Sequence, residues 1–172
     1  MPRNIEIKAR ITGIEAIEPR VAAVADAGPI TIDQDDTFLR CEGGRLKLRT
    51  FSATQGELIF YRRIDQPGPK ESFYLRSPTA EPESLRECLI RAHGQIGRVR
   101  KQRTLYLAGR TRIHLDRVAG LGDFLELEVV LEDCEPAETG EREARTLMAR
   151  LGIEPSQLIE GAYIDLLRGQ GG

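Results

Sequence analysis

Apolar and polar residues alternate through several short segments of this chain. From Arg3 to Ile11 every second residue is apolar, so an extended strand there would place its apolar side chains on one face and its polar side chains on the other. The same period of two, in places less regular, recurs seven more times. Eight segments are therefore expected to be strands: 3–11, 30–39, 44–51, 57–64, 70–76, 99–107, 112–118 and 123–132.

Helical spacing of apolar residues separates some of these strands and closes the chain. The first expected helix has Pro19 in its first turn and ends at Gly28, the second ends at Gly94, and the third ends at Gly152. The fourth opens at Pro155 and runs towards residue 167. Since no Ser/Pro-rich linker or internal repeat interrupts the pattern, we expect one α+β domain over residues 1–168 and a short flexible tail over 169–172.

The polar faces of these strands carry mostly Lys and Arg. A one-sided antiparallel sheet normally turns its polar face to water, and such a face usually mixes charges of both signs with small polar groups. A sheet closed into a barrel would instead turn the same face into a lumen lined by basic groups and a few carboxylates. Like charges crowded into a partly desolvated cavity repel, so a lumen of this kind is expected chiefly where an anion and a metal ion complete it.

The charge of the chain is distributed unevenly along its 172 residues. The formal net charge is only -2, but residues 40–117 carry seventeen Lys/Arg against eight Asp/Glu, and acidic segments flank them. The basic middle could bind nucleic acid, yet the chain has no Trp and only 5% aromatic residues for base stacking, so nucleic acid is an unlikely partner. A simpler explanation of the uneven charge also stays open: the basic and acidic segments could neutralise each other when the chain folds.

Composition and motifs narrow the class of protein further. No apolar run approaches the roughly 20 residues that a membrane helix needs, and the first ten residues lack the apolar core of a signal peptide, so we expect a cytoplasmic protein without a membrane partner. The three cysteines lack CxxC spacing and are expected to be reduced thiols. The signatures of P-loop, zincin, serine-hydrolase and Rossmann proteins are all missing.

Several segments together resemble the CYTH, or triphosphate tunnel metalloenzyme, family, which includes class IV adenylyl cyclases, thiamine triphosphatases and inorganic triphosphatases. The segments follow the order of the family: NIEIK at 4–8, LKLR at 46–49, KQR at 101–103, RIHLD at 112–116, GLGDFLELE at 120–128 and AYIDLL at 162–167. The sequences around KQR and GLGDF are most similar to those of the class IV cyclase branch. The resemblance implies a closed eight-stranded antiparallel barrel, with helices packed outside, whose tunnel binds a linear triphosphate.

The resemblance also implies roles for individual side chains. Metal ions, Mg²⁺ or Mn²⁺, would be held by Glu6, Glu126 and Glu128. The phosphate oxygens would be bound by Lys8, Lys47, Arg49, Arg63, Lys101, Arg103 and Arg112. Lys8, Arg112 and Asp116 are the expected catalytic residues, with Asp116 acting on the metal-bound water or, more simply, orienting a neighbouring base. Arg63 is preferred to the adjacent Arg62, Lys70 and Arg76 are weaker candidates, and His114 is expected to be a hydrogen-bonded structural residue.

One position departs from the family pattern. The family signature begins with a glutamate where this chain has Asn4, a neutral and poorer metal ligand. The similarity to the class IV cyclase branch favours a metal-dependent adenylyl cyclase that converts ATP to cyclic AMP and pyrophosphate. A triphosphatase acting on tripolyphosphate or an organic triphosphate, and a triphosphate binder weakened in catalysis by Asn4, stay open as alternatives. A homodimer also stays open.

Overall fold

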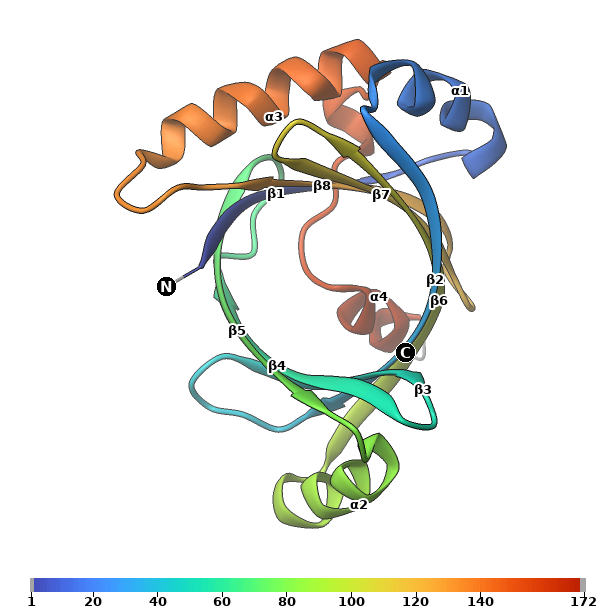
Figure 1. The fold of residues 1–172 in the computed structure, drawn as a ribbon, viewed down its shortest axis with the longest axis vertical. Helices are drawn as coiled ribbons and strands as arrows, with labels where there is room; N and C mark the ends of the chain where they lie inside the picture. The colour runs from blue at the N-terminus through green and yellow to red at the C-terminus, as the bar shows by residue number, and fades with distance from the viewer. Residues whose placement is uncertain (1, 171–172) are drawn as a thin grey trace.

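The computed structural model describes residues 2–170, and all eight expected strands are present in it (Figure 1). Most observed boundaries lie within three residues of the predicted ones. The largest difference is at the start of β6, which begins at residue 95 rather than 99. The strands are β1 (Arg3–Arg10), β2 (Ala27–Leu39), β3 (Arg45–Ser52), β4 (Gln55–Arg63), β5 (Lys70–Thr79), β6 (Gln95–Ala108), β7 (Thr111–Val118) and β8 (Gly122–Val130).

Every strand pairs with two antiparallel neighbours, in the order β1-β5-β4-β3-β2-β6-β7-β8, and β8 pairs back with β1. The sheet is therefore a closed barrel, and Figure 1 looks into its ring. Closure leaves each strand with one face outside and one face inside, as the period of two requires.

The outer face of β1, β7 and β8 is apolar and is covered by two helices, α1 (Ile14–Val24) and α3 (Ala137–Leu151). Their apolar stripes meet these strands in the main hydrophobic core, in which Ile5, Ile113 and Leu127 are fully buried. A third helix, α2 (Pro82–His93), contacts β2, β3 and β4 at another part of the wall. No helix within residues 2–170 is long and apolar enough to cross a membrane.

The fourth helix, α4 (Tyr163–Gly169), lies at one end of the barrel and projects within the ring in Figure 1. Tyr163 and Ile164 join a second apolar cluster with Phe38, Val99 and Phe124. Because Phe38, Val99 and Tyr163 also line the inner cavity, α4 covers one opening of the barrel. The expectation that all helices pack outside is therefore wrong for α4.

Two helix predictions need correction. The first helix begins at Ile14 and ends at Val24, so Pro19 is its sixth residue rather than part of its first turn, and Gly28 lies within β2. Pro19 is solvent-exposed, which leaves water free to hydrogen-bond the carbonyl that loses its donor. Helix α1 begins earlier than expected because Ile14 and Ile17 pack into the main hydrophobic core.

The continuous helix expected from Pro155 to residue 167 is also not formed. A 3₁₀ turn over Pro155–Gln157 is followed by extended chain, and α4 begins only at Tyr163. The extended part is held against β1, where the Ile159 N–H donates to the Lys8 carbonyl at 3.0 Å. Because α4 ends at Gly169, it runs one residue past the expected domain end, and residues 171–172 of the expected tail lie outside the described residues. All three cysteines are free.

Candidate functional site

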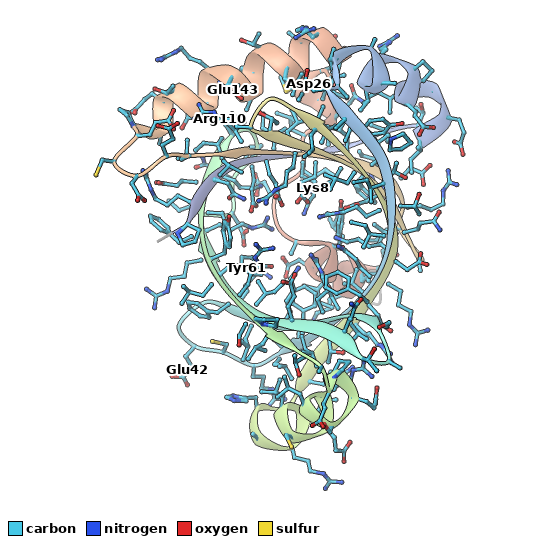
Figure 2. All side chains as sticks on the ribbon, viewed as in Figure 1. Lys8, Asp26, Glu42, Tyr61, Arg110 and Glu143 are labelled. Atoms are coloured by element: carbon cyan, nitrogen blue, oxygen red, sulfur yellow. The ribbon has the colours of Figure 1, made fainter. Side chains whose placement is uncertain are left out.

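The polar faces of all eight strands meet inside the barrel around a cavity of about 310 Å³. Figure 2 shows Lys8 and Tyr61 within the ring, whereas Arg110 and Glu143 lie outside it beside α3. Ten residues predicted for metal or phosphate binding line this cavity: Glu6, Lys8, Lys47, Arg49, Arg63, Lys101, Arg103, Arg112, Glu126 and Glu128. The barrel therefore brings together residues that lie up to 122 positions apart in the sequence.

Asp36 of β2 holds two basic residues of β3 in place. Arg49 donates from Nε and Nη2 to the two carboxylate oxygens of Asp36 at 2.7 and 2.8 Å, and Lys47 Nζ reaches Asp36 Oδ2 at 2.9 Å. Burial alone would raise the pKa of Asp36, but the charges of Arg49 and Lys47 outweigh it and hold the pKa well below its usual range. Asp36 thus stays charged and fixes both bases.

Asp116 of β7 does the same for the bases of β6. Arg103 donates from Nε and Nη2 to the two Asp116 oxygens, both at 2.7 Å, while Lys101 Nζ lies 3.4 Å from Oδ2. The Tyr163 hydroxyl of α4 also donates to Asp116 Oδ2, at 2.8 Å. Burial would raise the pKa of Asp116, but Arg103 and Lys101 keep it well below its usual range. These contacts favour an orienting role for Asp116.

The carboxylates of β1 and β8 carry the remaining contacts. Glu6 accepts from Arg63 Nη1 at 3.0 Å, and Glu128 accepts from Arg112 Nε at 2.8 Å. Glu126 lies 3.3 Å from Lys8 Nζ. Burial raises the pKa of Glu6, whereas the charges of Lys8 and Arg103 outweigh burial and lower the pKa of Glu126 well below its usual range.

Three side chains of the residue types that bind metal ions cluster on β7 and β8. Ligand atoms of His114, Glu126 and Glu128 lie within 4.8 Å of one another. His114 is 4% exposed, and its Nδ1 has no hydrogen-bond partner among residues 2–170. Burial, together with Arg103, lowers the pKa of His114, so its imidazole is neutral near pH 7 and has the form that binds metals. Glu6, the third predicted ligand, is paired with Arg63 instead.

The four basic residues of β4 and β5 differ in where they point. Arg63 faces the cavity, while the adjacent Arg62 is exposed and donates to the Gly43 carbonyl. Arg76 lines the cavity, and Lys70 is buried with its Nζ donating to the Gln66 and Ile159 carbonyls at 3.1 and 3.4 Å. Burial, with Arg63 and Lys8 nearby, lowers the pKa of Lys70 to about 8.

Two groups that the structure places in the site do not stand out in the sequence. Asp36 was not singled out, although it alternates with Gln34 and Phe38 on one face of β2 and so could have been recognised as an inward residue. The sequence predicts a structural role for His114, because it does not show that β7 lies beside the two glutamates of β8. Strand order supplies that information.

Comparisons with known proteins bear on this arrangement. The CYTH domain family model matches residues 2–163. Adenylate cyclase CyaB of Aeromonas hydrophila is 25% identical to this chain, over an alignment that covers 93% of this chain and 86% of the relative.

Solved structures of low sequence identity share the fold. The PH1012 protein of Pyrococcus horikoshii superposes with a TM-score of 0.83 at 24% identity, covering 95% of this chain and 98% of that one. The Hippeastrum protein HpAC1, whose structure is described together with a dominant triphosphatase activity, superposes with a TM-score of 0.69 at 16% identity, covering 99% and 96%.

Proposed function

The chain belongs to the CYTH domain family, and from this premise we propose that it is a divalent-metal-dependent enzyme that binds a linear triphosphate inside the barrel. One observation carries the proposal: basic side chains from β1, β3, β4, β6 and β7 converge on the lumen of the barrel, which also holds four glutamates and Asp36. Eight Lys and Arg residues line the cavity against five carboxylates, and the excess positive charge is costly to bury unless an anion compensates it. A triphosphate chain supplies that charge along an extended line.

The bases are arranged to receive phosphate oxygens without large rearrangement. Asp36 and Asp116 fix two Arg/Lys pairs by hydrogen bonds, so these pairs lose little conformational freedom when an anion binds. Arg63 is oriented by Glu6 through Nη1, while its buried Nη2 has no hydrogen-bond partner among the described residues. An N–H group left free in this way is suited to donate to a phosphate oxygen.

The residues present also fit a divalent metal ion. Glu126, Glu128 and His114 would hold it, with two carboxylate oxygens and one imidazole nitrogen. Mg²⁺ prefers oxygen ligands, whereas Mn²⁺ also accepts imidazole. This donor set therefore favours Mn²⁺ over Mg²⁺ more than a site made of carboxylates alone would. A bound ion would supply charge neutralisation at the phosphate oxygens. Glu6 could join only after leaving Arg63.

Two reactions are compatible with a triphosphate bound by these residues. In an adenylyl cyclase the ribose 3′-hydroxyl of ATP attacks the α-phosphorus, loses its proton, and displaces pyrophosphate to leave cyclic AMP. In a triphosphatase water attacks the terminal phosphorus and orthophosphate is released. In both reactions Lys8 and Arg112 would stabilise charge that develops on the phosphate oxygens. The similarity to CyaB supports the cyclase, and the activity described for HpAC1 supports the triphosphatase.

The direct experiment follows the products. ATP and tripolyphosphate are incubated separately with the protein and Mg²⁺ or Mn²⁺, and the mixtures are analysed by phosphorus NMR. Pyrophosphate with cyclic AMP identifies the cyclase, and orthophosphate identifies the triphosphatase. Lys101→Met should reduce either activity, whereas Arg100→Met, which changes the exposed neighbour on the opposite face of β6, should leave it unchanged. Intact substrates without any thermal stabilisation would overturn the proposal.

A binder without turnover is a second candidate because of Asn4. Asn4 is 2% exposed, lines the cavity, and has an Oδ1 without a hydrogen-bond partner among residues 2–170. If a missing carboxylate limits catalysis, Asn4→Glu raises turnover and metal stoichiometry measured by titration calorimetry. Asn4→Gln, which restores length without charge, is the control. Zero turnover in wild type and Asn4→Glu, with clear ligand binding in both, would exclude Asn4 as the cause.

A further inference from the structure

One edge of β2 has no partner strand along the first part of its length. The β2–β3 pairing covers only Asp35–Leu39, whereas β6 pairs with β2 from its first residue onward. Residues 30–34 therefore have a neighbouring strand on one side only, and we call their other side the free edge of β2. Where β3 turns away, a cleft of about 320 Å³ opens beside Gln34 and Phe51. Backbone groups on such an edge can hydrogen-bond a further strand.

The chain itself fills a comparable gap beside β1. The pairing of β1 with β5 covers only Arg3–Glu6. Beyond it the extended segment before α4 lies against β1, where Ala9 forms a bridge with Leu158 and the Ile159 N–H donates to the Lys8 carbonyl. Within residues 2–170 no segment pairs in this way with the free edge of β2. Only a strand from another molecule can complete it.

The residue types on the free edge favour pairing. The stagger of a barrel leaves other short edges, such as residues 75–79 of β5 on the side of β1. That edge holds Arg76 and Pro78, which are residue types that protect an edge from pairing. Residues 30–32 of β2 are instead three consecutive β-branched residues without a charge, and Ile30 is 51% exposed.

The free edge is also complementary to a second copy of itself. Ile30, Thr31 and Ile32 read the same in both directions, so two antiparallel copies centred on Thr31 place each isoleucine opposite an isoleucine and Thr31 opposite its own copy. Asp33 then lies opposite Pro29 of the second copy, and no two carboxylates face each other. Pairs of β-branched residues and Thr–Thr pairs stabilise antiparallel strands, whereas opposed like charges destabilise them.

We propose that two copies of this chain associate through the free edge of β2, with the strands antiparallel and centred on Thr31. Both copies use the same residues, as a two-fold symmetric interface requires. Backbone hydrogen bonds between the two β2 strands and burial of Ile30 from both copies stabilise the pair. The contact uses none of the side chains proposed to bind phosphate or metal, so it does not depend on the proposed function.

The first test measures association of the full chain and of two matched variants. Sedimentation velocity over the micromolar range should show wild-type protein passing from monomer to dimer, because an interface of this small size is expected to be weak. Thr31→Lys changes an exposed residue and opposes two like charges, so it should weaken the dimer at least about tenfold. Thr104→Lys makes the same change opposite Thr31 on β6, one strand further from the axis, and should leave association within about twofold.

A charge swap tests the register. Thr31→Asp alone should also weaken the dimer, whereas an equimolar mixture of the Thr31→Lys and Thr31→Asp variants should restore it, because opposite charges then face each other. Hydrogen exchange provides an independent readout. Amides within residues 30–34 of wild-type protein should exchange more slowly at high than at low protein concentration, and this difference should vanish in Thr31→Lys.

The outcomes separate the possibilities. Wild-type protein that stays monomeric throughout overturns the proposal and leaves the free edge to a strand of a different protein. A dimer that Thr31→Lys does not weaken, or that Thr104→Lys weakens equally, also overturns it. So does a dimer that Thr31→Lys strengthens, because that result points to a register with Thr31 opposite Asp33. Unchanged tripolyphosphate binding by the Thr31→Lys variant would show that it is folded.

Discussion

Asp116 is fully buried and remains ionised because three partners surround it. Arg103, Lys101 and the Tyr163 hydroxyl direct hydrogen bonds or positive charge at its two oxygens. Asp36 orients the bases of β3 in the same way. At the scale of single residues, the site is therefore built from carboxylates that orient bases, and the bases are what a phosphate would meet.

Replacing Asp116 by Asn should be strongly destabilising. The substitution leaves Arg103 and Lys101 buried without their counter-charge, which typically costs about 3–5 kcal/mol. The free energy of unfolding from urea titration measures the effect. Asp35→Asn is the control, because Asp35 pairs with the more exposed Arg98 on the outer face, and its loss should cost about 0–1 kcal/mol. Equal losses in both variants would contradict the assigned role of Asp116.

Lys101 should make stability and ligand binding depend on pH. Burial, together with Arg103, lowers the pKa of Lys101 from 10.5 to about 7 in the folded protein. Between these values the unfolded chain binds more protons, so the stability of the free protein rises with pH across that window. A bound phosphate favours charged Lys101, so tripolyphosphate binding at pH 8.5 should take up protons.

Titration calorimetry in buffers of different ionisation enthalpy measures that proton uptake. Lys101→Arg keeps the positive charge but does not titrate in this range, so uptake should fall in this variant. Unchanged uptake would assign the proton to another group, such as Lys70, whose pKa is about 8.

At the scale of elements, close packing of α3 against the barrel depends on Gly140. A Cβ at this position would lie 2.7 Å from both Ile5 Cγ1 and Leu131 Cδ2. The fully buried Ile5 belongs to the core and has little room to move. The glycine therefore lets the first turn of α3 approach β1 more closely than any other residue would.

Gly140→Ala should destabilise the protein even though alanine favours helices. Overpacking costs about 1–3 kcal/mol, and the helix gains about 0.5–1 kcal/mol, so a net loss of up to about 2.5 kcal/mol is expected. Thr146→Ala, at an exposed position of the same helix, should change stability by less than about 0.5 kcal/mol. A stabilised Gly140→Ala variant, measured by thermal or urea unfolding, would show that α3 can shift away from β1 without cost.

At the scale of the whole molecule, the barrel encloses a cavity whose lining is rich in Lys and Arg. Repulsion among these groups lowers the stability of the free protein, and a bound anion removes it. Stability should therefore be linked to ligand. At 100 times the dissociation constant, tripolyphosphate with Mg²⁺ adds about 2.7 kcal/mol, which for this size raises the melting temperature by roughly 5–11 °C. Sulfate at equal ionic strength is the control, and an absent shift would count against the tunnel.

The alternation of side chains could be predicted from the sequence, because period two is a local property of an extended chain. It placed the strands, the apolar outer faces, and bases such as Arg49 and Arg103 on the inner face. Helix ends were less predictable. The contacts that decide them, such as the Ile159 N–H with the Lys8 carbonyl, join residues far apart in the chain.

The sequence by itself thus determined eight two-faced strands, an α+β domain and the residue types of a basic inner face. Only the tertiary structure decided which side chains meet: Asp36 with the β3 bases, Glu6 with Arg63, and His114 with the β8 glutamates. Only it showed that α4 covers one end of the barrel. The physical reason is that alternation depends on neighbours along the chain, whereas ion pairs, burial and cavity openings depend on strand order and register.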